Sequence, residues 1–474
     1  MTALQEVPIA AISTERFRPL LGDGYAEIED AIARAHEGLR GRIVWHVNST
    51  ARGGGVAEML HSLLAYGRGA GVDLRWLTIG GSPEFFQLTK RLHNYLHEAP
   101  GDDGPLGPAE HEIYERGLME SADELTGLMR KGDIVYIHDP QPAGLVPHVK
   151  SADVSVVWRC HIGIDNPGRY AHEGWKFLRR YIQEADAYVF SRKRFAWDGL
   201  DGARTWIVPP SIDIFSPKNQ DLEDEAVRSI LAVTGVRSGD HFANALFKHL
   251  DGSEARVDRA AELDQDGPVP DEAPLITQVS RWDRLKDHVG VLHCFAEHVR
   301  NPSAHLLLVG PSVAGVADDP EGAEVLTEVR ATREAFDPQL RQRIHLATLP
   351  MDDVAENAAM VNAIQRRSDI VLQKSLAEGF GLTVAEAMWK SKPVIAGAVG
   401  GIQDQIEDGV SGILVDPSDL AAVGAAIDRL LGDPDRMARM GEAARQRVID
   451  HFLGTRHLIQ YIYLLTGMLD DNET

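Results

Sequence analysis

The sequence is poor in cysteine and in long apolar runs. Its 474 residues include two cysteines, Cys160 and Cys294, which stand far apart in the chain. Such isolated thiols form neither a disulfide framework nor a CxxC metal cluster, and they are typical of a reducing compartment. No stretch of about 18 uncharged apolar residues occurs, and residues 1–20 do not resemble a signal peptide. A cytoplasmic protein without a membrane partner is therefore expected.

Positive charge and metal-ligand patterns are also scarce. Lys and Arg number 48 against 71 Asp and Glu, which gives a net charge of −23. Such a chain repels nucleic acid and anionic lipid, so no nucleic-acid partner is predicted. A small phosphate-bearing ligand is not excluded, because a few cations in one cleft suffice to bind it. The 19 histidines show neither HExxH nor paired ligand spacing, so no metal site is predicted.

Short apolar runs alternate with helix-like stretches along both halves of the chain. In the first half, strands are expected at Arg42–Val47, Leu74–Ile79, Asp133–Ile137, Val154–Trp158 and Tyr188–Phe190. In the second half, they are expected at Leu275–Ser280, His305–Val309, Arg343–Leu346, Asp369–Gln373, Pro393–Ala396 and Gly412–Val415. Strand–helix alternation of this kind predicts an α/β protein with two doubly wound parallel sheets.

A proline-rich segment separates the two halves. Three prolines in Trp206–Pro217 continue neither a helix nor a central strand, so the first domain is expected to cover 1–217. The second domain is expected over 218–454, and a helix over 455–474 is expected to cross back onto the first. Residues 218–272 are polar and acidic, and are a helical insertion or a connecting segment. The crossing helix is compatible with a homodimer.

Three consecutive glycines follow the first expected strand. Gly53, Gly54 and Gly55 allow backbone N–H groups to approach a ligand closely, and the helix that begins there favours negative charge. The segment matches neither GxGxxG nor a Walker lysine motif, which argues against dinucleotide and P-loop functions. A plain glycine turn is the alternative, but the position after a strand favours an anion site.

Charged motifs follow two strands of the second half. Arg281 and Lys286 come after the strand that opens this half, and their spacing lets both reach one phosphate group. Glu378 and Glu386 flank seven residues after the strand DIVLQ. The glycines between them bare backbone N–H groups at the start of a helix, which predicts a second anion site. A solvated cation pair and helix-capping glutamates are the alternatives.

Polar residues also follow two strands of the first half. His161, Asp165 and Asn166 come after the strand VVWRC, whereas Asp139 and Gln141 come after DIVYI. Because parallel strands end at the same edge of a sheet, these side chains suggest a pocket of carbohydrate size. A structural histidine is the alternative for His161.

Taken together, these motifs resemble the retaining glycosyltransferases of the GT-B fold, in the large family of sucrose-synthase-like and glycogen-synthase-like enzymes. The resemblance covers roughly residues 40–465, although 218–272 departs from the compact family core. Narrower similarity, to trehalose glycosyltransferring synthases and trehalose phosphorylases, lies in VNSTARGGGVAEML, HDPQPAG, WRCHIGID and QKSLAEGFGLTVAEAMWKSKPV. The resemblance implies two Rossmann-like domains that face an interdomain cleft.

The resemblance also implies roles for single residues. Arg281 and Lys286 would neutralise the departing diphosphate, an effect worth about 3–4 kcal/mol for each well-placed donor. His161 would contact the donor hexose, so that the implied catalytic residues are Glu378, Arg281, Lys286 and His161. The implied donor-binding residues are Gly54, Gly55, Gly379, Phe380, Gly381, Leu382, Thr383 and Glu386. The acceptor-binding candidates are Asp139, Gln141, Asp165 and Asn166.

The implied activity is transfer of glucose from a nucleoside-diphosphate-glucose (UDP-, ADP- or GDP-glucose) to glucose, with trehalose as product. Basic residues replace an obligatory metal in this fold, so no cofactor is expected. Two alternatives remain: a trehalose phosphorylase, and a sugar-nucleotide-binding protein without turnover. A retaining hydrolase is disfavoured, because it needs two carboxylates about 5 Å apart across the scissile bond.

Overall fold

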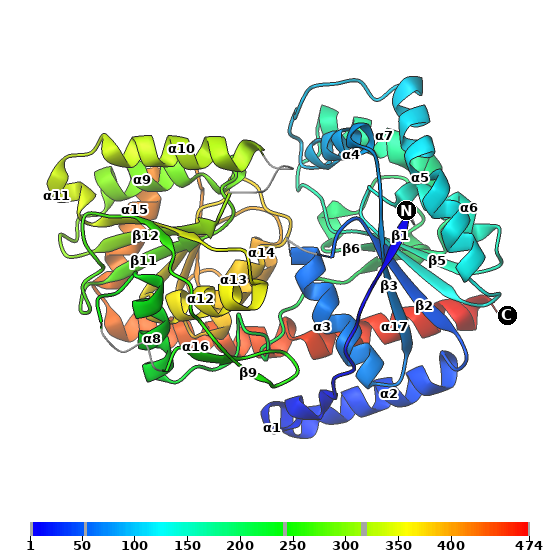
Figure 1. The fold of residues 1–474 in the computed structure, drawn as a ribbon, viewed down its shortest axis with the longest axis horizontal. Helices are drawn as coiled ribbons and strands as arrows, with labels where there is room; N and C mark the ends of the chain where they lie inside the picture. The colour runs from blue at the N-terminus through cyan, green and yellow to red at the C-terminus, as the bar shows by residue number, and fades with distance from the viewer. Residues whose placement is uncertain (1–2, 52–54, 240–243, 314–319, 473–474) are drawn as a thin grey trace. The chain divides into compact units, whose positions relative to one another are not determined.

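The computed structural model describes residues 3–51, 55–239, 244–313 and 320–472. Contacts divide the protein into two compact units (Figure 1). Unit 1 comprises Met1–Ser211 together with Gly454–Thr474, and unit 2 comprises Ile212–Leu453. The last helix of the chain therefore belongs to the same unit as its first strands.

Unit 1 is built on a seven-stranded sheet of order β1-β3-β2-β4-β5-β6-β7. All neighbouring strands are parallel except the edge pair β1–β3. The strands are β1 (Leu4–Val7), β2 (Ile43–Asn48), β3 (Asp73–Ile79), β4 (Ile134–His138), β5 (Ser155–Cys160), β6 (Ala187–Phe190) and β7 (Thr205–Ile207). Parallel neighbours require crossover connections, so helices cover both faces of the sheet.

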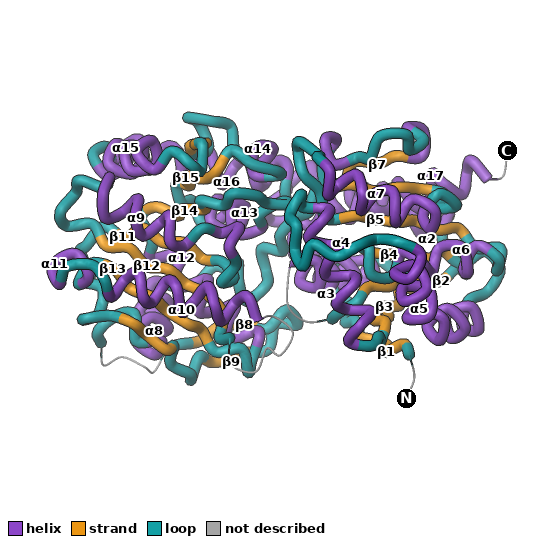
Figure 2. Tube along the Cα trace, turned by 90° about the horizontal axis from the view of Figure 1, so that it is seen from above, coloured by secondary structure: helices purple, strands orange, loops and turns teal. Residues whose placement is uncertain are grey.

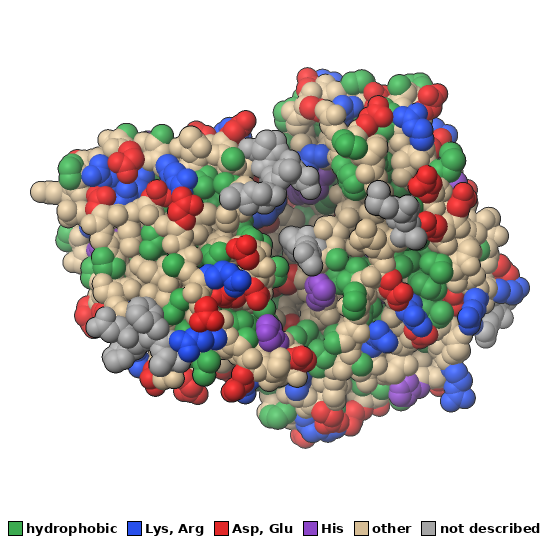
Figure 3. Space-filling view, in the orientation of Figure 1, with side chains coloured by type: hydrophobic (Ala, Val, Ile, Leu, Met, Phe, Trp, Pro, Cys, Tyr) green, Lys and Arg blue, Asp and Glu red, His purple; other side chains and the backbone are tan. Residues whose placement is uncertain are grey.

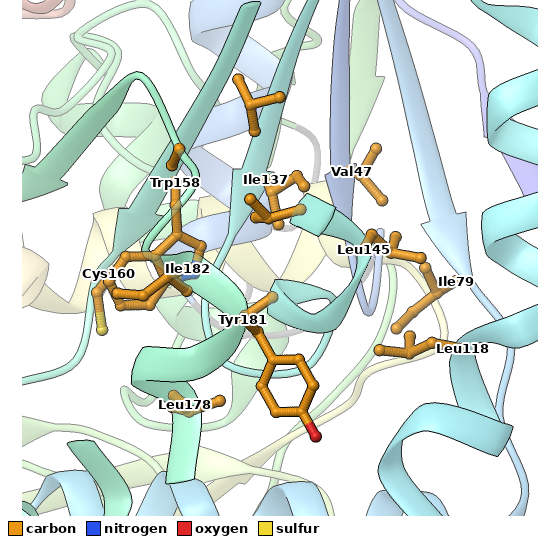
Figure 4. Packing of buried hydrophobic residues seen from close by; sticks show 14 of the residues in the cluster. Val47, Ile79, Leu118, Ile137, Leu145, Trp158, Cys160, Leu178, Tyr181 and Ile182 are labelled. Carbon is orange, nitrogen blue, oxygen red and sulfur yellow. The ribbon is translucent and has the colours of Figure 1, made fainter. Parts of the chain in front are cut away.

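The helices of unit 1 lie on both faces of its sheet (Figure 2). They are α1 (Arg18–Leu21), α2 (Ala26–Gly38), α3 (Gly55–Gly69), α4 (Pro83–Leu96), α5 (Pro108–Leu128), α6 (Val146–Lys150), α7 (Arg169–Ile182) and α17 (Gly454–Asn472). On one face, Val47, Ile137 and Trp158 share an apolar core with Leu118 of α5 and Leu178 of α7 (Figure 4). Side chains alternate between the two faces along a strand. The residues next to these three in their own strands therefore point to the opposite face.

The opposite face of this sheet buries polar side chains among apolar ones. It carries His46 of β2, Tyr136 of β4 and Arg159 of β5. Helix α17 packs beside α2 and α3 (Figure 1), and its Tyr461 contacts His46 on this face. Leu458, Ile462 and Leu465 of α17 are buried and recur every three or four residues, as expected for a helix with one apolar side. The polar groups of this face are thus enclosed by a helix from the far end of the chain.

Unit 2 repeats the architecture with the order β10-β13-β12-β11-β14-β15-β16, and here the edge pair β10–β13 is antiparallel. The strands are β10 (Glu262–Asp264), β11 (Leu275–Val279), β12 (His305–Pro311), β13 (Ile344–Leu349), β14 (Ile370–Gln373), β15 (Val394–Gly397) and β16 (Ile413–Val415). The helices are α8 (Asp224–Thr234), α9 (His288–His298), α10 (Pro320–Glu334), α11 (Pro338–Arg341), α12 (Val354–Arg367), α13 (Leu382–Trp389), α14 (Ile402–Gln405), α15 (Leu420–Leu431) and α16 (Pro434–His451).

The two faces of this second sheet bury separate apolar clusters. Leu306 and Leu308 of β12 join the cluster of α9, α10 and α15. Leu307 and Val309, which alternate with them, join the cluster of α8 and α12. A strand buried on both faces is apolar at every position, which explains the continuous run HLLLV in the sequence. The predicted α/β fold with two Rossmann-like, doubly wound domains is confirmed.

The segment 218–272 is folded wherever it is described. It holds the helix α8, the hairpin β8 (Leu246–Lys248) with β9 (Glu254–Arg256), and the edge strand β10. Val227, Ile230 and Leu231 of α8 are buried in the cluster shared with α12. The segment therefore combines one helix with short strands, and it extends the sheet of unit 2 by one antiparallel strand.

The strand orders identify where each sheet binds ligands. In unit 2, the order reverses between β11 and β14, and in unit 1 between β2 and β4. Ligands of doubly wound sheets bind beyond the carboxyl ends of the strands at such reversals. The segments that follow these strands are therefore the candidates for function.

The charged surface is mixed. Acidic and basic side chains are interspersed on the face drawn in Figure 3. Arg330, for example, bonds to both Glu262 at 2.6 Å and Asp264 at 2.8 Å. Among the described helices, none has both the length and the apolar character that crossing a bilayer requires.

Candidate active site

The reversal point of unit 2 holds a close pair of opposite charges. Lys286 ends a short 3-10 turn after β11, and Glu378 lies in the loop after β14. Lys286 Nζ lies 2.6 Å from Glu378 Oε2, and each side chain is 13% exposed. The low local dielectric strengthens such a partly buried pair beyond a surface ion pair. The structure thus brings together two of the residues that were predicted to be catalytic.

Glu378 also ends a line of neutral hydrogen-bond donors, which we call the carboxylate network. Thr383 Oγ1 donates to Gln373 Oε1 at 3.1 Å, and Gln373 Nε2 donates to Ser375 Oγ at 2.9 Å. Ser375 Oγ then donates to Glu378 Oε2 at 3.1 Å. An ionised carboxylate only accepts and an amide nitrogen only donates, so each bond in the network has one possible direction.

A buried ion pair joins the segment of Lys286 to the segment of Glu378. Lys374 follows β14 with a fully buried side chain, and its ammonium bonds to the carboxylate of Asp287. Asp287 also accepts from the backbone of Gly290 and caps α9. Gln278 links the two segments, because it donates to the Lys286 carbonyl and accepts from the Lys374 backbone N–H. These bonds fix the backbone on either side of the Lys286–Glu378 pair.

The loop after Glu378 depends on close backbone packing. Gly381 precedes α13 with a φ of +82°, a conformation that glycine adopts readily. A Cβ on Gly400 would lie 1.7 Å from the Glu378 carbonyl oxygen. Gln405 donates to the Phe380 and Gly381 carbonyls at 2.5 and 3.2 Å. The two glycines and Gln405 therefore hold the loop in one conformation.

The other residues of unit 2 that were predicted to bind the sugar-nucleotide donor lie around this loop. Leu382 begins α13, whose N-terminus has no side-chain cap, and Gly379 accepts from the Gly401 N–H at 3.0 Å. Phe380 packs 5.7 Å from Phe452, between ring centroids. An uncapped helix N-terminus favours a negatively charged ligand.

Two predicted residues have other partners. Arg281 is 53% exposed and bonds to Asp283 at 3.1 Å. Glu386 is 1% exposed, and its Oε1 lies 3.5 Å from Lys218 Nζ. Lys218 precedes α8 within unit 2 and was not predicted from sequence.

In unit 1, the predicted residues Asp139 and His161 form one assembly. Asp139 follows β4 with a φ of +68°, and its Oδ1 accepts the backbone N–H of His161 at 2.7 Å. Burial raises the pKa of the Asp139 carboxyl to about 7, although the bond from His161 opposes this rise. The carboxylate that was expected to bind the acceptor thus also holds the backbone of His161.

His161 is the half-buried end of a second line of hydrogen bonds, which we call the histidine network. Tyr461 Oη lies 2.6 Å from His46 Nε2, and His46 Nδ1 lies 2.9 Å from His138 Nε2. His138 Nδ1 lies 3.2 Å from His161 Nε2. Burial is the main cause that lowers the pKa of all three histidines, that of His46 to about 3. Their rings are therefore neutral near pH 7.

The remaining predicted residues of unit 1 are placed individually. Asp165 bonds to Arg192 at 2.7 Å, and both side chains are nearly buried. Asn166 is exposed, and Gln141 is half-buried. Gly55 begins α3, whereas Gly54 lies outside the described residues.

Several site residues escaped the sequence analysis. Eight residues of the two networks and of the bonds that support them were not predicted: His46, His138, Tyr461, Gln278, Asp287, Gln373, Lys374 and Ser375. His46 interrupts the apolar run RIVWHV, which was an available signal for a buried polar group. Among the described residues, no group of three or more His, Cys, Asp or Glu side chains is arranged to hold a metal ion.

Comparisons with known proteins agree with this geometry. A family model described as "Trehalose synthase, N-terminal domain" matches residues 46–197, and one described as "Glycosyl transferases group 1" matches residues 260–447. The fold also resembles a sucrose-phosphate synthase from Thermosynechococcus elongatus, with a TM-score of 0.61 and 16% identity over 91% of this chain and 99% of that one. The fold and these matches define a glycosyltransferase of the GT-B fold.

Relatives that match nearly the whole chain identify a family within this class of glycosyltransferases. A trehalose synthase from Pyrococcus horikoshii is 35% identical over 96% of this chain and 96% of its own. A trehalose phosphorylase from Pleurotus pulmonarius is 29% identical over 95% of this chain but 60% of its own. The chain belongs to the family of the trehalose synthases.

Proposed function

We propose that this protein transfers glucose from a nucleoside-diphosphate-glucose to glucose and forms trehalose with retention at the anomeric carbon. The Lys286–Glu378 pair, 2.6 Å apart at the reversal point of the unit 2 sheet, is the observation that carries the proposal. It supplies a cation for a departing diphosphate and a carboxylate for sugar hydroxyls in one place. The relatives named trehalose synthase support the choice of product.

In this proposal, unit 2 holds the donor. Lys286 and the uncapped N-terminus of α13 face the diphosphate, Glu378 accepts from hexose hydroxyls, and Glu386 contacts the ribose. Arg281 must leave Asp283 to join them, and its 53% exposure leaves it room to turn. No metal or other cofactor is assigned to the reaction.

The proposed chemistry needs no protein nucleophile. The bond from the anomeric carbon to the phosphate oxygen breaks, and its electron pair leaves with the diphosphate. The acceptor hydroxyl oxygen bonds to the same face of the anomeric carbon, and its proton passes to the departing phosphate oxygen. Lys286 stabilises the charge that develops on the phosphate, and we expect this to be the protein's main contribution to the rate. The acceptor glucose is assigned to Gln141 and Asn166 of unit 1, because the Asp139 and Asp165 carboxylates already bond to the His161 N–H and to Arg192.

Trehalose phosphorolysis is the second candidate, and the similarity to the Pleurotus pulmonarius enzyme over 95% of this chain favours it. Inorganic phosphate would then occupy the place of the diphosphate beside Lys286. The two reactions share the cation and the carboxylate, so the site alone serves either one. They differ in the substrate that must be supplied.

Paired incubations test the proposal. The purified protein is incubated with glucose and each of UDP-, ADP- and GDP-glucose, and in parallel with trehalose and phosphate; the Glu378→Ala variant is the matched control. We expect release of the nucleoside diphosphate together with a non-reducing disaccharide that trehalase cleaves.

Two other results contradict the proposal. Formation of glucose 1-phosphate from trehalose and phosphate, without transfer from any sugar nucleotide, assigns the phosphorylase reaction. Thermal stabilisation by a sugar nucleotide without any turnover assigns a binding protein instead.

A further inference from the structure

The histidine network links His161 to the C-terminal helix through four buried or half-buried side chains. Its members are His161 after β5, His138 at the end of β4, His46 on β2 and Tyr461 on α17. The three contacts measure 3.2, 2.9 and 2.6 Å, in order from His161 to Tyr461. These distances are hydrogen-bond lengths, so each contact must hold one proton.

The rings carry one proton each. Burial lowers the pKa values of His46, His138 and His161, so each imidazole has one N–H donor and one bare nitrogen acceptor near neutral pH. Three neutral imidazoles in line have two consistent arrangements: every proton on Nδ1, or every proton on Nε2. The group that bonds to His46, at the end of the network opposite to His161, determines which of the two arrangements forms.

Tyr461 is that group. If every proton lay on Nε2, His46 would donate to the Tyr461 oxygen, and the hydroxyl proton would then need another acceptor. Within the described residues, Tyr461 Oη has no second hydrogen-bond partner. A buried donor without an acceptor destabilises the fold, because it loses its hydrogen bond to water without replacement. If every proton lies on Nδ1, Tyr461 donates to His46, each histidine donor between them has an acceptor, and only the Nδ1–H of the half-buried His161 is left for a ligand.

We infer that Tyr461 is a positioning residue that sets the direction of the histidine network and thereby places the proton of His161 on Nδ1. The bare Nε2 of His161 is then occupied by His138, and the Nδ1–H is the group that remains for a ligand. Among the described residues, that nitrogen has no partner.

The consequence is chemical. His161 presents a hydrogen-bond donor, so it binds a hydroxyl or phosphate oxygen and does not take up a proton from the acceptor sugar. Burial raises the pKa of Tyr461 well above its usual value, which keeps the hydroxyl proton in place. The identity of the ligand as a hexose rests on the proposed function, whereas the position of the proton rests on the network alone.

Nitrogen NMR of the full-length protein tests the inference without any substrate. Histidine labelled with 15N distinguishes protonated from bare ring nitrogens, and the His161→Asn spectrum assigns the His161 signals. Two internal standards exist in unit 1. Arg159 donates to His457 Nε2, which requires a proton on Nδ1, and the Ala70 carbonyl accepts from His36 Nε2, which requires a proton there. We expect His161, His138 and His46 to match His457; protons on Nε2 in all three overturn the inference.

The Tyr461→Phe variant tests the role of the phenol. The ring remains to pack 5.5 Å from His46, and only the hydroxyl is lost. We expect a mixture of both tautomers at His161 and a fall in kcat of about fivefold to tenfold, with KM for the sugar nucleotide changed less than twofold. Tyr463→Phe is the control on the same helix, because Tyr463 is 43% exposed and lies outside the network.

The outcomes separate the two proposals. An unchanged His161 tautomer in Tyr461→Phe overturns the role of Tyr461, even if the variant is less active or less stable. Absence of trehalose formation by the wild-type protein, with the Nδ1 proton observed, rejects the proposed function and leaves the inference standing.

Discussion

Each unit contains a hydrogen-bond network that ends at a predicted site residue, but one network ends on a donor and the other on an acceptor. The histidine network of unit 1 consists of neutral groups and, in our inference, presents a donor at His161. The carboxylate network of unit 2 ends on a hydrogen-bond acceptor, the carboxylate of Glu378, whose Oε2 lies 2.6 Å from Lys286 Nζ. The first network has two possible directions and needs a phenol to choose one, whereas the second has a single direction because its amide and carboxylate have fixed roles.

The two networks also differ in how far apart their residues lie in the sequence. Apart from Lys286, the carboxylate network lies within one short stretch, from Gln373 to Thr383. The histidine network collects two strands, the residue after a third strand, and a helix from the end of the chain. The carboxylate network is therefore a local structure, whereas the histidine network forms only when α17 is docked.

The largest expected effect concerns the buried ion pair behind Lys286. In Asp287→Asn, the fully buried Lys374 ammonium loses its counter-charge, and removing one partner of a buried pair costs about 3–5 kcal/mol. Asparagine preserves the helix cap and tolerates the φ of +50° at this position. Lys374→Met should cost less, because the Asp287 carboxylate is 22% exposed and can be hydrated. Urea unfolding of both variants measures the difference; equal losses contradict this account of the pair.

The next effect is on catalysis. Lys286→Ala and Glu378→Ala should each lower turnover at least about a hundredfold, because each removes charge from the place where the donor reacts. Steady-state rates at saturating sugar nucleotide give the measurement. Arg284→Ala is the matched control, since Arg284 lies in the same 3-10 turn but is 57% exposed and bonds to Glu328. Rates near that of the wild type in the two site variants would reject the assignment.

Unit 1 should show a pH dependence that originates at Asp139. Its folded pKa of about 7 lies above the ordinary value of 3.8, so the folded state holds a proton that the unfolded state releases in this window. The stabilisation is present below pH 4 and is lost as the pH rises to 7. Asp139→Asn should remove this loss, which amounts to about 2 kcal/mol between pH 5 and 7.

The measurement is the free energy of unfolding at pH 5 and pH 7 for the wild type and the variant. Taking the difference between the two proteins cancels the contribution of all other titrating groups, including the buried histidines. The exposed Asp198 provides the control, because Asp198→Asn should keep the slope of the wild type. A parallel slope for Asp139→Asn would mean that the Asp139 carboxyl is already ionised at pH 5.

The sequence was informative wherever burial produces a pattern. Parallel strands covered on both faces appear as unbroken apolar runs, so HLLLV and DIVLQ located β12 and β14. The edge strands β1, β7 and β10 were not predicted, because strands of three or four residues at an edge need no such run. Lys286 and Glu378 could be assigned to the same site in advance, because each follows a strand of the same parallel sheet, but their direct contact was not predicted.

Other site residues carry no such signal. Tyr461 lies 415 positions from His46 in the sequence, and only the docking of α17 brings the two together. Lys374 looks like a surface residue in the sequence, since lysine is almost never fully buried unless it is paired. No sequence pattern indicates that the carboxylates of Asp139 and Asp165 bond to the His161 N–H and to Arg192.

The smallest expected effect tests how much the neutral part of the carboxylate network contributes. Ser375→Ala removes one donor to Glu378 and leaves Gln373 Nε2 without its acceptor, but Lys286 still holds the carboxylate. We expect kcat to fall about fivefold, close to 1 kcal/mol, and the exposed Ser303→Ala to change nothing. In the Lys286→Ala background, the same substitution should cost more, because no second group then orients Glu378. An equal fall in kcat in both backgrounds would show that Ser375 and Lys286 act independently. The charge of Lys286 alone would then not set the geometry of this site.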